Sequence, residues 1–250
     1  MSLTESNTRM ASTSMNRAIH HLNGIKAITF DLDGTLWDYD TVMRRSMAYA
    51  LAELGKHDAV AASMLDVDRM VDICEMVSRE LVPPVVDLGL VRLEAFKRTL
   101  VEVDRGDDEL AERINALYLR HRFTNVAFYD DALPALEALG RRYDLGALSN
   151  GNSRPSLIGI GDMFRFVVMS QDHGVAKPDR RLFEIAVREA GCSADQVLHV
   201  GDDVDHDVLG AMNAGVRAVW VNRHRAARPD EIDGAAEVAD LIELLEMLTN

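Results

Sequence analysis

The sequence has little cysteine and no long apolar run, and each shortage excludes a class of protein. Cys74 and Cys192 are the only cysteines, so a disulfide framework is not expected, and no Cys/His cluster has the spacing of a zinc site. No apolar run approaches the roughly 20 residues that a membrane-spanning helix needs. Residues 1–23 are polar and lack the apolar centre of a signal peptide, so we expect a flexible tail on a soluble, cytoplasmic protein.

The sequence also has fewer basic than acidic residues. The chain carries 27 Lys and Arg against 41 Asp and Glu, which gives a formal net charge of -14. Such a surface disfavours nonspecific binding to nucleic acid or to an anionic membrane, and we expect neither as a partner. A small anionic substrate is compatible with this charge, because a metal ion and one lysine can reverse the local potential.

The periodicity of the apolar residues divides the chain into an α/β core and a helical insert. Its 250 residues, 48% of them hydrophobic, suffice for one large α/β domain or for a core with a smaller second domain. Residues 25–30 are apolar and rich in β-branched side chains, which predicts a buried strand. From about residue 41 to 122 strand signals nearly vanish, and the pattern predicts a small helical bundle. After residue 130 strands and helices alternate, which is typical of a parallel sheet with helices on both faces.

The predicted elements set the expected domain boundaries. Helices of the insert are predicted at 41–54, 62–81, 89–103 and 108–121. Beyond the insert, helices are predicted at 132–141, 180–190, 205–214 and 237–248, and strands at 143–148, 166–169, 197–200 and 216–221. We therefore assign 24–38 and 127–250 to the core, 39–126 to the insert and 1–23 to the tail, with hinges near 37–40 and 123–130.

Two aspartates directly follow the first predicted strand. Asp31 and Asp33 lie two positions apart, so at a strand end both side chains can reach one pocket. Such a pair suits aspartyl-phosphate chemistry, in which one carboxylate attacks and the other exchanges a proton with the leaving oxygen and with water. Gly34 would permit a tight turn, and Thr35 offers a hydroxyl. Taken alone, the segment is equally compatible with a turn whose aspartates are solvated.

A second acidic cluster, at residues 201–207, follows the predicted strand at 197–200. Clustered carboxylates at a strand end suit Mg2+, which prefers octahedral oxygen coordination, and Asp202 and Asp207 are the expected ligands. Asp203 or Asp205 is expected to cap the helix that follows. A calcium loop fits the spacing poorly, because no glutamate follows at the distance that such a loop requires.

Two weaker signals lie between these clusters. Ser149 and Asn150 follow the predicted strand at 143–148 and offer a hydroxyl and an amide to phosphate oxygens. Lys177 precedes Pro178, which is expected to begin a helix, and its compact charge suits phosphate or the orientation of a carboxylate. Each signal alone is better explained by an ordinary turn or a surface lysine.

Together and in this order, the four segments resemble the motifs of the haloacid dehalogenase-like hydrolase superfamily. The resemblance extends over about residues 26–222, and its first and last motifs are the specific ones. It implies a Rossmann-like α/β core with a helical cap inserted early in the chain. It also implies a magnesium-dependent phosphatase that acts on a small phosphorylated metabolite, as a monomer or homodimer.

The resemblance assigns roles residue by residue. Asp31 would be the nucleophile and Asp33 the general acid/base. Ser149 and Asn150 would bind the transferring phosphoryl group, and Lys177 would stabilise the charge around it.

The same resemblance implies a metal site. Mg2+ would be bound by Asp31, by the backbone carbonyl of Asp33 and by Asp202, with Asp207 as a direct or indirect support. The metal would neutralise carboxylate and phosphate charge, so that an anionic nucleophile can approach an anionic ester. Asp203 stands where many relatives have a small neutral residue, so its role as a cap, an indirect support or an extra ligand stays open.

Asp33 distinguishes two reactions within the superfamily. The dehalogenases lack an acid at this position, since a halide needs no proton, so Asp33 favours phosphate esters over carbon–halogen bonds. A phosphomutase or a phosphonate hydrolase on the same fold stays open, and the latter needs a cap lysine for which Lys56 and Lys97 are the candidates. A non-catalytic binding protein is the least favoured alternative, because no catalytic carboxylate is missing.

Leaving-group specificity is expected from the cap and from the loops that follow the motifs. The candidates are Trp37, Asp38, Tyr39, Arg44 and Arg45 after the first motif, and Asn152, Ser153 and Arg154 after the second. For each of them, packing at the domain junction or a solvated helix face is the stronger interpretation.

Overall fold

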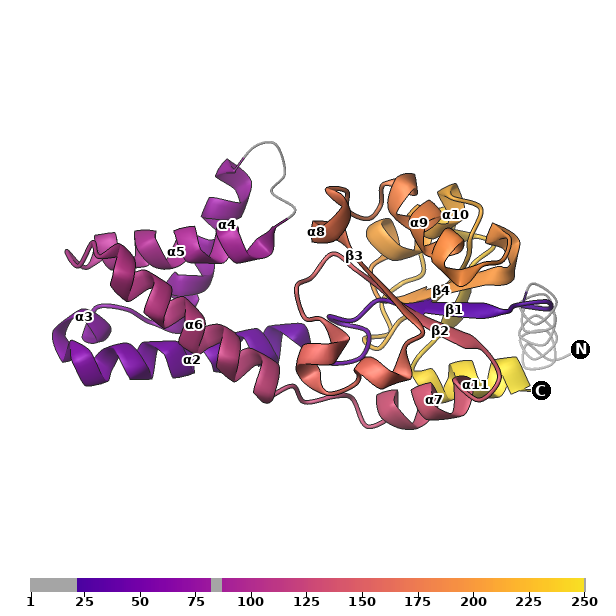
Figure 1. The fold of residues 1–250 in the computed structure, drawn as a ribbon, viewed down its shortest axis with the longest axis horizontal. Coiled ribbons are helices and arrows are strands. Elements are labelled where there is room, and N and C mark those ends of the chain that lie inside the picture. The colour runs from indigo at the N-terminus through magenta and orange to yellow at the C-terminus, as the bar shows by residue number, and fades with distance from the viewer. Residues whose placement is uncertain (1–21, 82–86, 250) are drawn as a thin grey trace, which may run out of the picture.

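A computed structural model describes residues 22–81 and 87–249, and its centre is a six-stranded parallel sheet (Figure 1). The strand order is β3-β2-β1-β4-β5-β6, and each paired strand runs parallel to its neighbour. The strands are β1 (Ala27–Phe30), β2 (Asp144–Ser149), β3 (Phe166–Met169), β4 (Val197–Gly201), β5 (Arg217–Val221) and β6 (Ala236–Val238). This confirms the predicted α/β fold with a Rossmann-like core. Apart from its last two residues, the expected N-terminal tail lies outside the described part of the chain.

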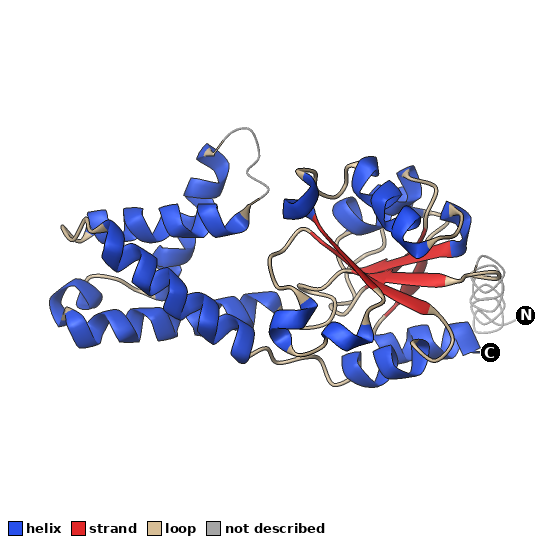
Figure 2. Ribbon diagram, in the orientation of Figure 1, coloured by secondary structure: helices blue, strands red, loops and turns tan. Residues whose placement is uncertain are grey.

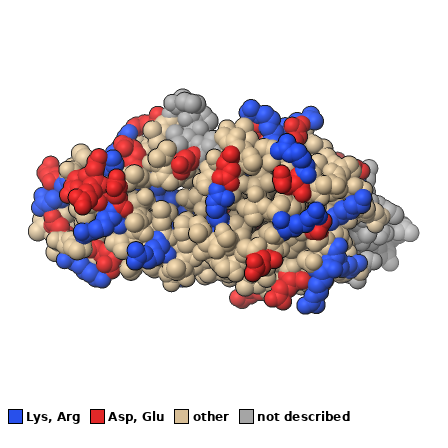
Figure 3. All heavy atoms as spheres, in the orientation of Figure 1, with Lys and Arg blue, Asp and Glu red and all other residues tan. Residues whose placement is uncertain are grey.

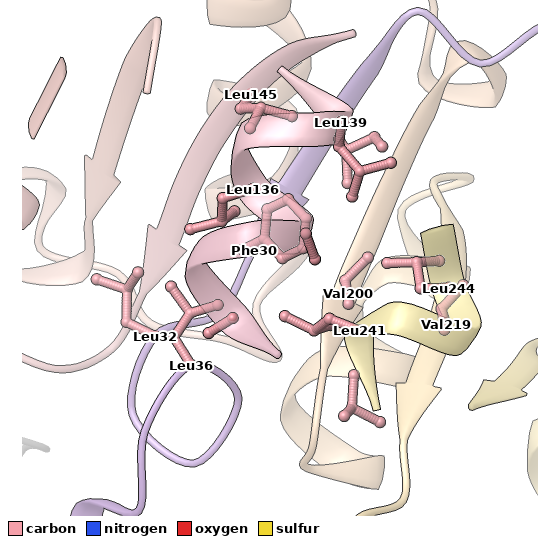
Figure 4. Close-up of a cluster of buried hydrophobic side chains, with 14 of the residues drawn as sticks. Phe30, Leu32, Leu36, Leu136, Leu139, Leu145, Val200, Val219, Leu241 and Leu244 are labelled. Carbon is pink, nitrogen blue, oxygen red and sulfur yellow. The ribbon is translucent and has the colours of Figure 1, made fainter. Parts of the chain in front are cut away.

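Helices cover both faces of the sheet, which explains why every residue of β1 and β4 is buried instead of every second one (Figure 2). On one face, Phe30 of β1 packs in a cluster with α7 (Ala132–Leu139) and α11 (Leu241–Thr249), as Figure 4 shows. The opposite face is covered by α9 (Arg180–Ala190) and α10 (Gly210–Asn213), which contribute to a second apolar cluster.

In the described residues of the insert between β1 and α7 there are five helices, and Figure 1 shows them together at one end of the molecule. They are α2 (Tyr39–His57), α3 (Ala59–Ser63), α4 (Val67–Glu80), α5 (Leu88–Glu102) and α6 (Asp108–Thr124). Each begins after an aspartate whose side chain accepts a backbone N–H of the first turn: Asp38, Asp58, Asp66, Asp87 and Asp107. Their buried apolar faces form clusters of their own, so the insert has its own core.

The predicted bounds of two helices were wrong. The helix predicted at 62–81 is divided into α3 and α4, because Asp66 accepts the Arg69 backbone N–H at 2.7 Å and starts a new helix. The first residues of the helix predicted at 237–248 belong to strand β6, which pairs with β5 at the sheet edge. The Pro83-Pro84 pair that separates two predicted helices lies outside the described residues.

The predicted helix at 205–214 also differs from the structure. It begins with a π-helical turn, η4 (Val204–Leu209), and continues as the short helix α10. In this turn the backbone N–H of Val208 reaches the carbonyl of Asp203, five residues back, at 3.3 Å. A further short helix, α8 (Ser170–His173), was not predicted.

Three neighbouring strands of the sheet, β2, β1 and β4, end at the same edge. Their carboxyl ends deliver Ser149, Asp31 and Asp202 to that edge, where ligands bind in open α/β sheets. On the face drawn in Figure 3, acidic and basic side chains are interspersed over both the core and the insert. Within the described ranges, no helix is both long and apolar enough to cross a membrane.

Candidate active site

Asp31 follows β1 and forms a buried ion pair with Lys177. The lysine Nζ lies 2.6 Å from Oδ1 of Asp31 and 2.5 Å from Oδ1 of Asp207. Burial raises the pKa of Asp31; Lys177 opposes this, while the charges of Asp207 and Asp202 add to it. Burial alone would lower the pKa of Lys177, but Asp207 and Asp31 outweigh burial and raise it. Lys177 is therefore a cation at neutral pH, positioned between two carboxylates.

Asp207 is fixed by a buried chain of hydrogen-bonding groups. His199 Nε2 lies 3.1 Å from Asp207 Oδ1, and its Nδ1 lies 2.9 Å from the Thr29 hydroxyl. The backbone N–H of Asp203 donates to Asp207 Oδ2 at 3.1 Å. Burial alone would raise the pKa of Asp207, but Lys177 and His199 lower it, so this carboxylate is ionised. Burial lowers the pKa of His199, which favours a neutral ring that donates to Asp207.

Asp202 is positioned by the first motif. The Thr35 hydroxyl donates to Asp202 Oδ1 at 2.8 Å, and Trp220 Nε1 donates to the Asp202 carbonyl at 2.9 Å. Gly34 has a φ of +92, and a Cβ at this residue would lie 2.4 Å from Asp202 Oδ2. Both the backbone conformation and the close approach therefore require glycine. Burial raises the pKa of Asp202 to about 6.

Three of these carboxylates could bind a metal ion. One oxygen from each of Asp31, Asp202 and Asp207 lies within 4.8 Å of the others. Their mutual repulsion contributes to the raised pKa values of Asp31 and Asp202, and Lys177 supplies only one positive charge against the three. Hard oxygen donors that need further positive charge fit a divalent cation such as Mg2+. The expected ligation by the backbone carbonyl of Asp33 stays a prediction.

Asp33 has a separate set of donors. Trp37 Nε1 donates to Asp33 Oδ1 at 3.0 Å, and Arg122 Nη2 lies 3.3 Å from the same oxygen. The Ser153 hydroxyl lies 3.5 Å from Oδ1. A Cβ at Gly151 would lie 2.2 Å from Oδ2, so the absence of a side chain there leaves room for the carboxylate. These contacts fix the orientation of Asp33.

Arg122 reaches Asp33 from the last turn of α6, in the insert. Its side chain is 1% exposed, and it also donates to Asn152 Oδ1 at 3.0 Å and to the Ser153 hydroxyl at 2.8 Å. Its guanidinium carbon lies 4.9 Å from the centre of the Tyr39 ring. Burial alone would lower the pKa of Arg122, but the charge of Asp33 raises it. The end of the insert is thus bonded to the core beside Asp33.

Ser149 and Asn150 lie at the end of β2. The buried Ser149 hydroxyl accepts the Gly151 backbone N–H at 3.0 Å, so its own hydrogen can be donated to a ligand. The Asn150 amide donates to the Lys177 carbonyl at 2.9 Å and accepts the Lys177 backbone N–H at 2.7 Å. Asn150 thereby positions Lys177, and direct phosphate binding by Asn150 stays a prediction.

A cavity of about 410 Å³ opens beside Asp33 and Asp202. Its lining includes Asp33, Gly34 and Asp202 from the core, Tyr39 from α2, and Arg223 and His224 from the loop after β5. Its volume lies within the range of sites for small molecules, roughly 300–1,000 Å³.

The structure brings the predicted residues of four distant segments together at one edge of the sheet. Asp203 is exposed and accepts the His206 backbone N–H at 2.7 Å, so it caps η4 and lies outside the carboxylate triad. Sequence reasoning missed Arg122 and His199. A histidine inside an apolar strand was a usable signal for His199, whereas nothing in the sequence separates Arg122 from Arg120.

Comparisons with known proteins identify relatives of two kinds. Residues 25–215 match the family model of haloacid dehalogenase-like hydrolases. The chain is 28% identical over 203 residues to the 5-amino-6-(5-phospho-D-ribitylamino)uracil phosphatase YigB of Escherichia coli, with 80% of this chain and 84% of that protein covered. It is 28% identical over 237 residues to the (S)-2-haloacid dehalogenase of Pseudomonas putida, with 92% and 99% covered. The crystal structure of 2-haloacid dehalogenase from Pseudomonas syringae pv. Tomato DC3000 matches with a TM-score of 0.76 and 30% identity, over 90% of this chain and 98% of that one.

Proposed function

Because the chain belongs to the haloacid dehalogenase-like hydrolase family, we propose that it is a Mg2+-dependent phosphatase of small phosphorylated metabolites. The observation that carries the proposal is the position of Lys177 between Asp31 and Asp207, beside a triad of carboxylates within 4.8 Å. This combination of an anionic attacker, a fixed cation and a set of metal ligands suits the transfer of a phosphoryl group. The existence of phosphatases among the relatives supports it.

The proposed reaction has two steps. In the first, a carboxylate oxygen of Asp31 attacks phosphorus, the bond from phosphorus to the ester oxygen breaks, and Asp33 gives its proton to the departing alcohol. In the second, water attacks the same phosphorus and Asp33 accepts the proton, which releases phosphate and restores the Asp31 carboxylate. The donors Trp37 and Arg122 keep Asp33 oriented toward the leaving oxygen.

The other predicted site residues have supporting roles in this proposal. Ser149 donates its hydroxyl to a phosphoryl oxygen, and Lys177, positioned by Asn150, stabilises the negative charge around it. Asp207 orients Lys177 and completes the metal-binding triad.

The proposed metal is Mg2+, bound by Asp31, Asp202 and the carbonyl of Asp33, with Asp207 as a direct or indirect support. When bound, it supplies positive charge that offsets the repulsion between these carboxylates and the phosphate.

Asp33 is the reason for preferring phosphate esters to carbon–halogen bonds, although dehalogenases are among the relatives. An alkoxide leaving group needs a proton and a halide does not. A carboxylate with its own set of donors beside the attacking aspartate therefore has a function in ester hydrolysis. Measurement of halide release from 2-chloropropionate tests the alternative, and dehalogenation faster than ester hydrolysis would reverse this preference.

The phosphonate alternative receives no support from the two candidate lysines. Lys56 and Lys97 lie in ion pairs with Glu53 and Asp108 at the surface of the insert. A phosphomutase uses the same first step, and transfer of the phosphoryl group to a second hydroxyl in place of water would reveal it.

The domain boundaries, the cytoplasmic location and the monomeric or homodimeric state stay predictions from the sequence.

Hydrolysis of p-nitrophenyl phosphate, with Mg2+ and with a chelator, tests the proposal. We expect Asp31→Asn to lower kcat at least about a thousandfold, as removal of a covalent nucleophile does. Asp195→Asn, a matched change at an exposed aspartate before β4, should leave kcat unchanged. Equal activity of the Asp31→Asn protein, or full activity without a divalent ion, would contradict the proposal.

A further inference from the structure

Arg223 lies in the loop after β5 and lines the cavity beside Asp33 and Asp202, but the proposed reaction does not use it. Its Nη2 donates to the backbone carbonyl of Thr35 at 2.8 Å. Thr35 is fully buried, and its carbonyl has no other hydrogen-bond partner among the residues that the structure describes. A buried carbonyl without a partner costs free energy, so Arg223 stabilises the turn that carries Thr35.

The guanidinium of Arg223 is itself held in one orientation. Its Nη1 and Nη2 donate to the two carboxylate oxygens of Asp131 at 3.1 and 2.9 Å, and its central carbon lies 3.9 Å from the centre of the Tyr129 ring. Asp131 also accepts the backbone N–H of Leu241, at the start of α11, at 2.8 Å. Burial alone would raise the pKa of Asp131, but the hydrogen bonds from Arg223 and Leu241 lower it, so the pair is ionised at neutral pH. A bidentate ion pair and a stacked ring leave the guanidinium little freedom.

Thr35 connects Arg223 to the carboxylate triad. Its carbonyl accepts a hydrogen bond from Arg223, while its hydroxyl donates to Asp202 Oδ1 at 2.8 Å. Asp202 belongs to the triad whose oxygens lie within 4.8 Å of one another. A threonine side chain has few accessible χ1 rotamers, so the position of its backbone restricts where its hydroxyl can lie.

Another hydrogen bond holds the same turn, but at a different residue. The backbone N–H of Tyr129 donates to the Leu36 carbonyl at 2.9 Å, and Leu36 belongs to the same apolar cluster as Leu241 (Figure 4). These contacts place the turn against the core, whereas Arg223 acts on Thr35 itself.

We propose that Arg223 is a positioning residue of the metal site: it fixes Thr35, whose hydroxyl orients Asp202 toward the metal ion. The inference rests on the proposed Mg2+-dependent function. Groups that hydrogen-bond to metal ligands orient those ligands, and their removal typically costs about 10- to 100-fold in metal affinity. Arg223 acts on such a group from its other side, so its loss should reach the metal site only through Thr35.

Calorimetric titration of the metal-free protein with Mg2+ tests the inference through a double-mutant cycle. Thr35→Val removes the hydroxyl with little change of shape and should weaken Mg2+ binding about 10- to 100-fold. Arg223→Met should weaken it about tenfold, the effect of one lost hydrogen bond. If Arg223 acts through Thr35, Arg223→Met added to Thr35→Val should weaken binding by no more than about a further twofold, whereas independent effects would multiply.

Further variants separate positioning from a purely structural role. Asp131→Asn breaks the same ion pair but leaves Arg223 able to reach Thr35, so the thermal stability should fall while the affinity for Mg2+ stays within about threefold. Arg225→Met is the matched control, because Arg225 is exposed in the same loop, and neither quantity should change in it. If Arg223→Met does not fold, the comparison of Asp131→Asn with Asp131→Asn/Arg223→Met gives the same test without an unpaired carboxylate.

Several results would overturn the inference: no Mg2+ binding by the unsubstituted protein, unchanged binding in Arg223→Met or in Thr35→Val, an effect of Arg223→Met that persists in the Thr35→Val protein, or equal weakening by Asp131→Asn. Failure of the proposed function is a different result, since it appears as absent hydrolysis of p-nitrophenyl phosphate by an unsubstituted protein that binds Mg2+. The double-mutant cycle can be read in that case as well.

Discussion

Lys177→Met removes the cation between Asp31 and Asp207 while preserving most of the side-chain volume. Lys177 Nζ lies 2.6 Å from one carboxylate and 2.5 Å from the other, and its side chain is 3% exposed. After the substitution two buried carboxylates face each other with no cation between them. Removal of one partner from a buried ion pair costs about 3–5 kcal/mol, and we expect the free energy of unfolding of the metal-free protein at pH 8 to fall by that amount.

The loss should depend on pH in a defined direction. The pKa of Lys177 is raised in the folded protein, so its contribution is complete below the ordinary lysine pKa and is lost only at strongly alkaline pH. The unsubstituted protein therefore keeps this contribution from pH 5 to pH 8. In the variant, Asp31 and Asp207 lose the cation that favours their charged forms, so either can take up a proton as the pH falls and relieve the repulsion. The destabilisation should be largest at pH 8 and smaller at pH 5.

Urea denaturation at the two pH values, with a chelator present, measures both quantities. Lys56→Met is the matched control, because Lys56 lies at the surface in an ion pair with Glu53, and the substitution should change the free energy of unfolding by no more than about 0.5 kcal/mol. A loss below about 1 kcal/mol for Lys177→Met would refute the reasoning, since a buried pair would then have the energetics of an exposed one. A large loss that is identical at pH 5 and pH 8 would show that packing, and not charge, is responsible.

Three further predictions concern the neighbouring groups. Gly34→Ala should weaken Mg2+ binding in a calorimetric titration and destabilise the protein by more than Gly24→Ala does. Gly24 has a similar φ of +83, but no atom of the described residues lies within 4 Å of an added Cβ there. Similar effects of the two substitutions would show that the close approach to Asp202 is unimportant. The affinity for Mg2+ should fall roughly tenfold per pH unit below about 6. Burial raises the pKa of Asp202 to about 6, and its carboxyl group must lose a proton before it can bind a metal. An affinity that stays constant down to pH 5 would argue against Asp202 as a ligand. Arg122→Met should lower kcat/KM for p-nitrophenyl phosphate about 10- to 100-fold, since a charged hydrogen-bond donor of Asp33 is lost, and unchanged kinetics would assign Arg122 a structural role alone.

The site residues that could be predicted from the sequence lie directly after predicted strands. Asp31 and Asp202 directly follow short apolar runs, and a parallel sheet brings the carboxyl ends of such runs to one edge whatever their separation along the chain. This is how two clusters 171 positions apart can share one site, and it makes the fold class predictable; the resemblance to the superfamily is what assigned the two clusters to that site. The apolar runs themselves are a consequence of a sheet buried on both faces.

The residues that could not be predicted depend on how helices dock. Arg122 lies in the sequence Arg120-His121-Arg122, which reads as the basic last turn of an exposed helix, and only the packing of α6 on the core buries it. The same applies to Arg92, whose burial depends on α6 lying across α5. Strand β6 was missed for a different reason: its three residues adjoin the apolar pattern of α11, and the helical periodicity extends into them.

The position of Arg122 links the placement of the insert to the chemistry at Asp33. Hinges were expected near 37–40 and 123–130, so Arg122 lies on the insert side of the second hinge. Its side chain nevertheless bonds to Asp33, Asn152 and Ser153 of the core. A rigid rotation of the insert about that hinge would break these bonds, and Asp33 would lose a charged donor whenever the site opened. In the proposed mechanism, the arginine that bonds the insert to the core is therefore also a charged donor to the general acid, Asp33.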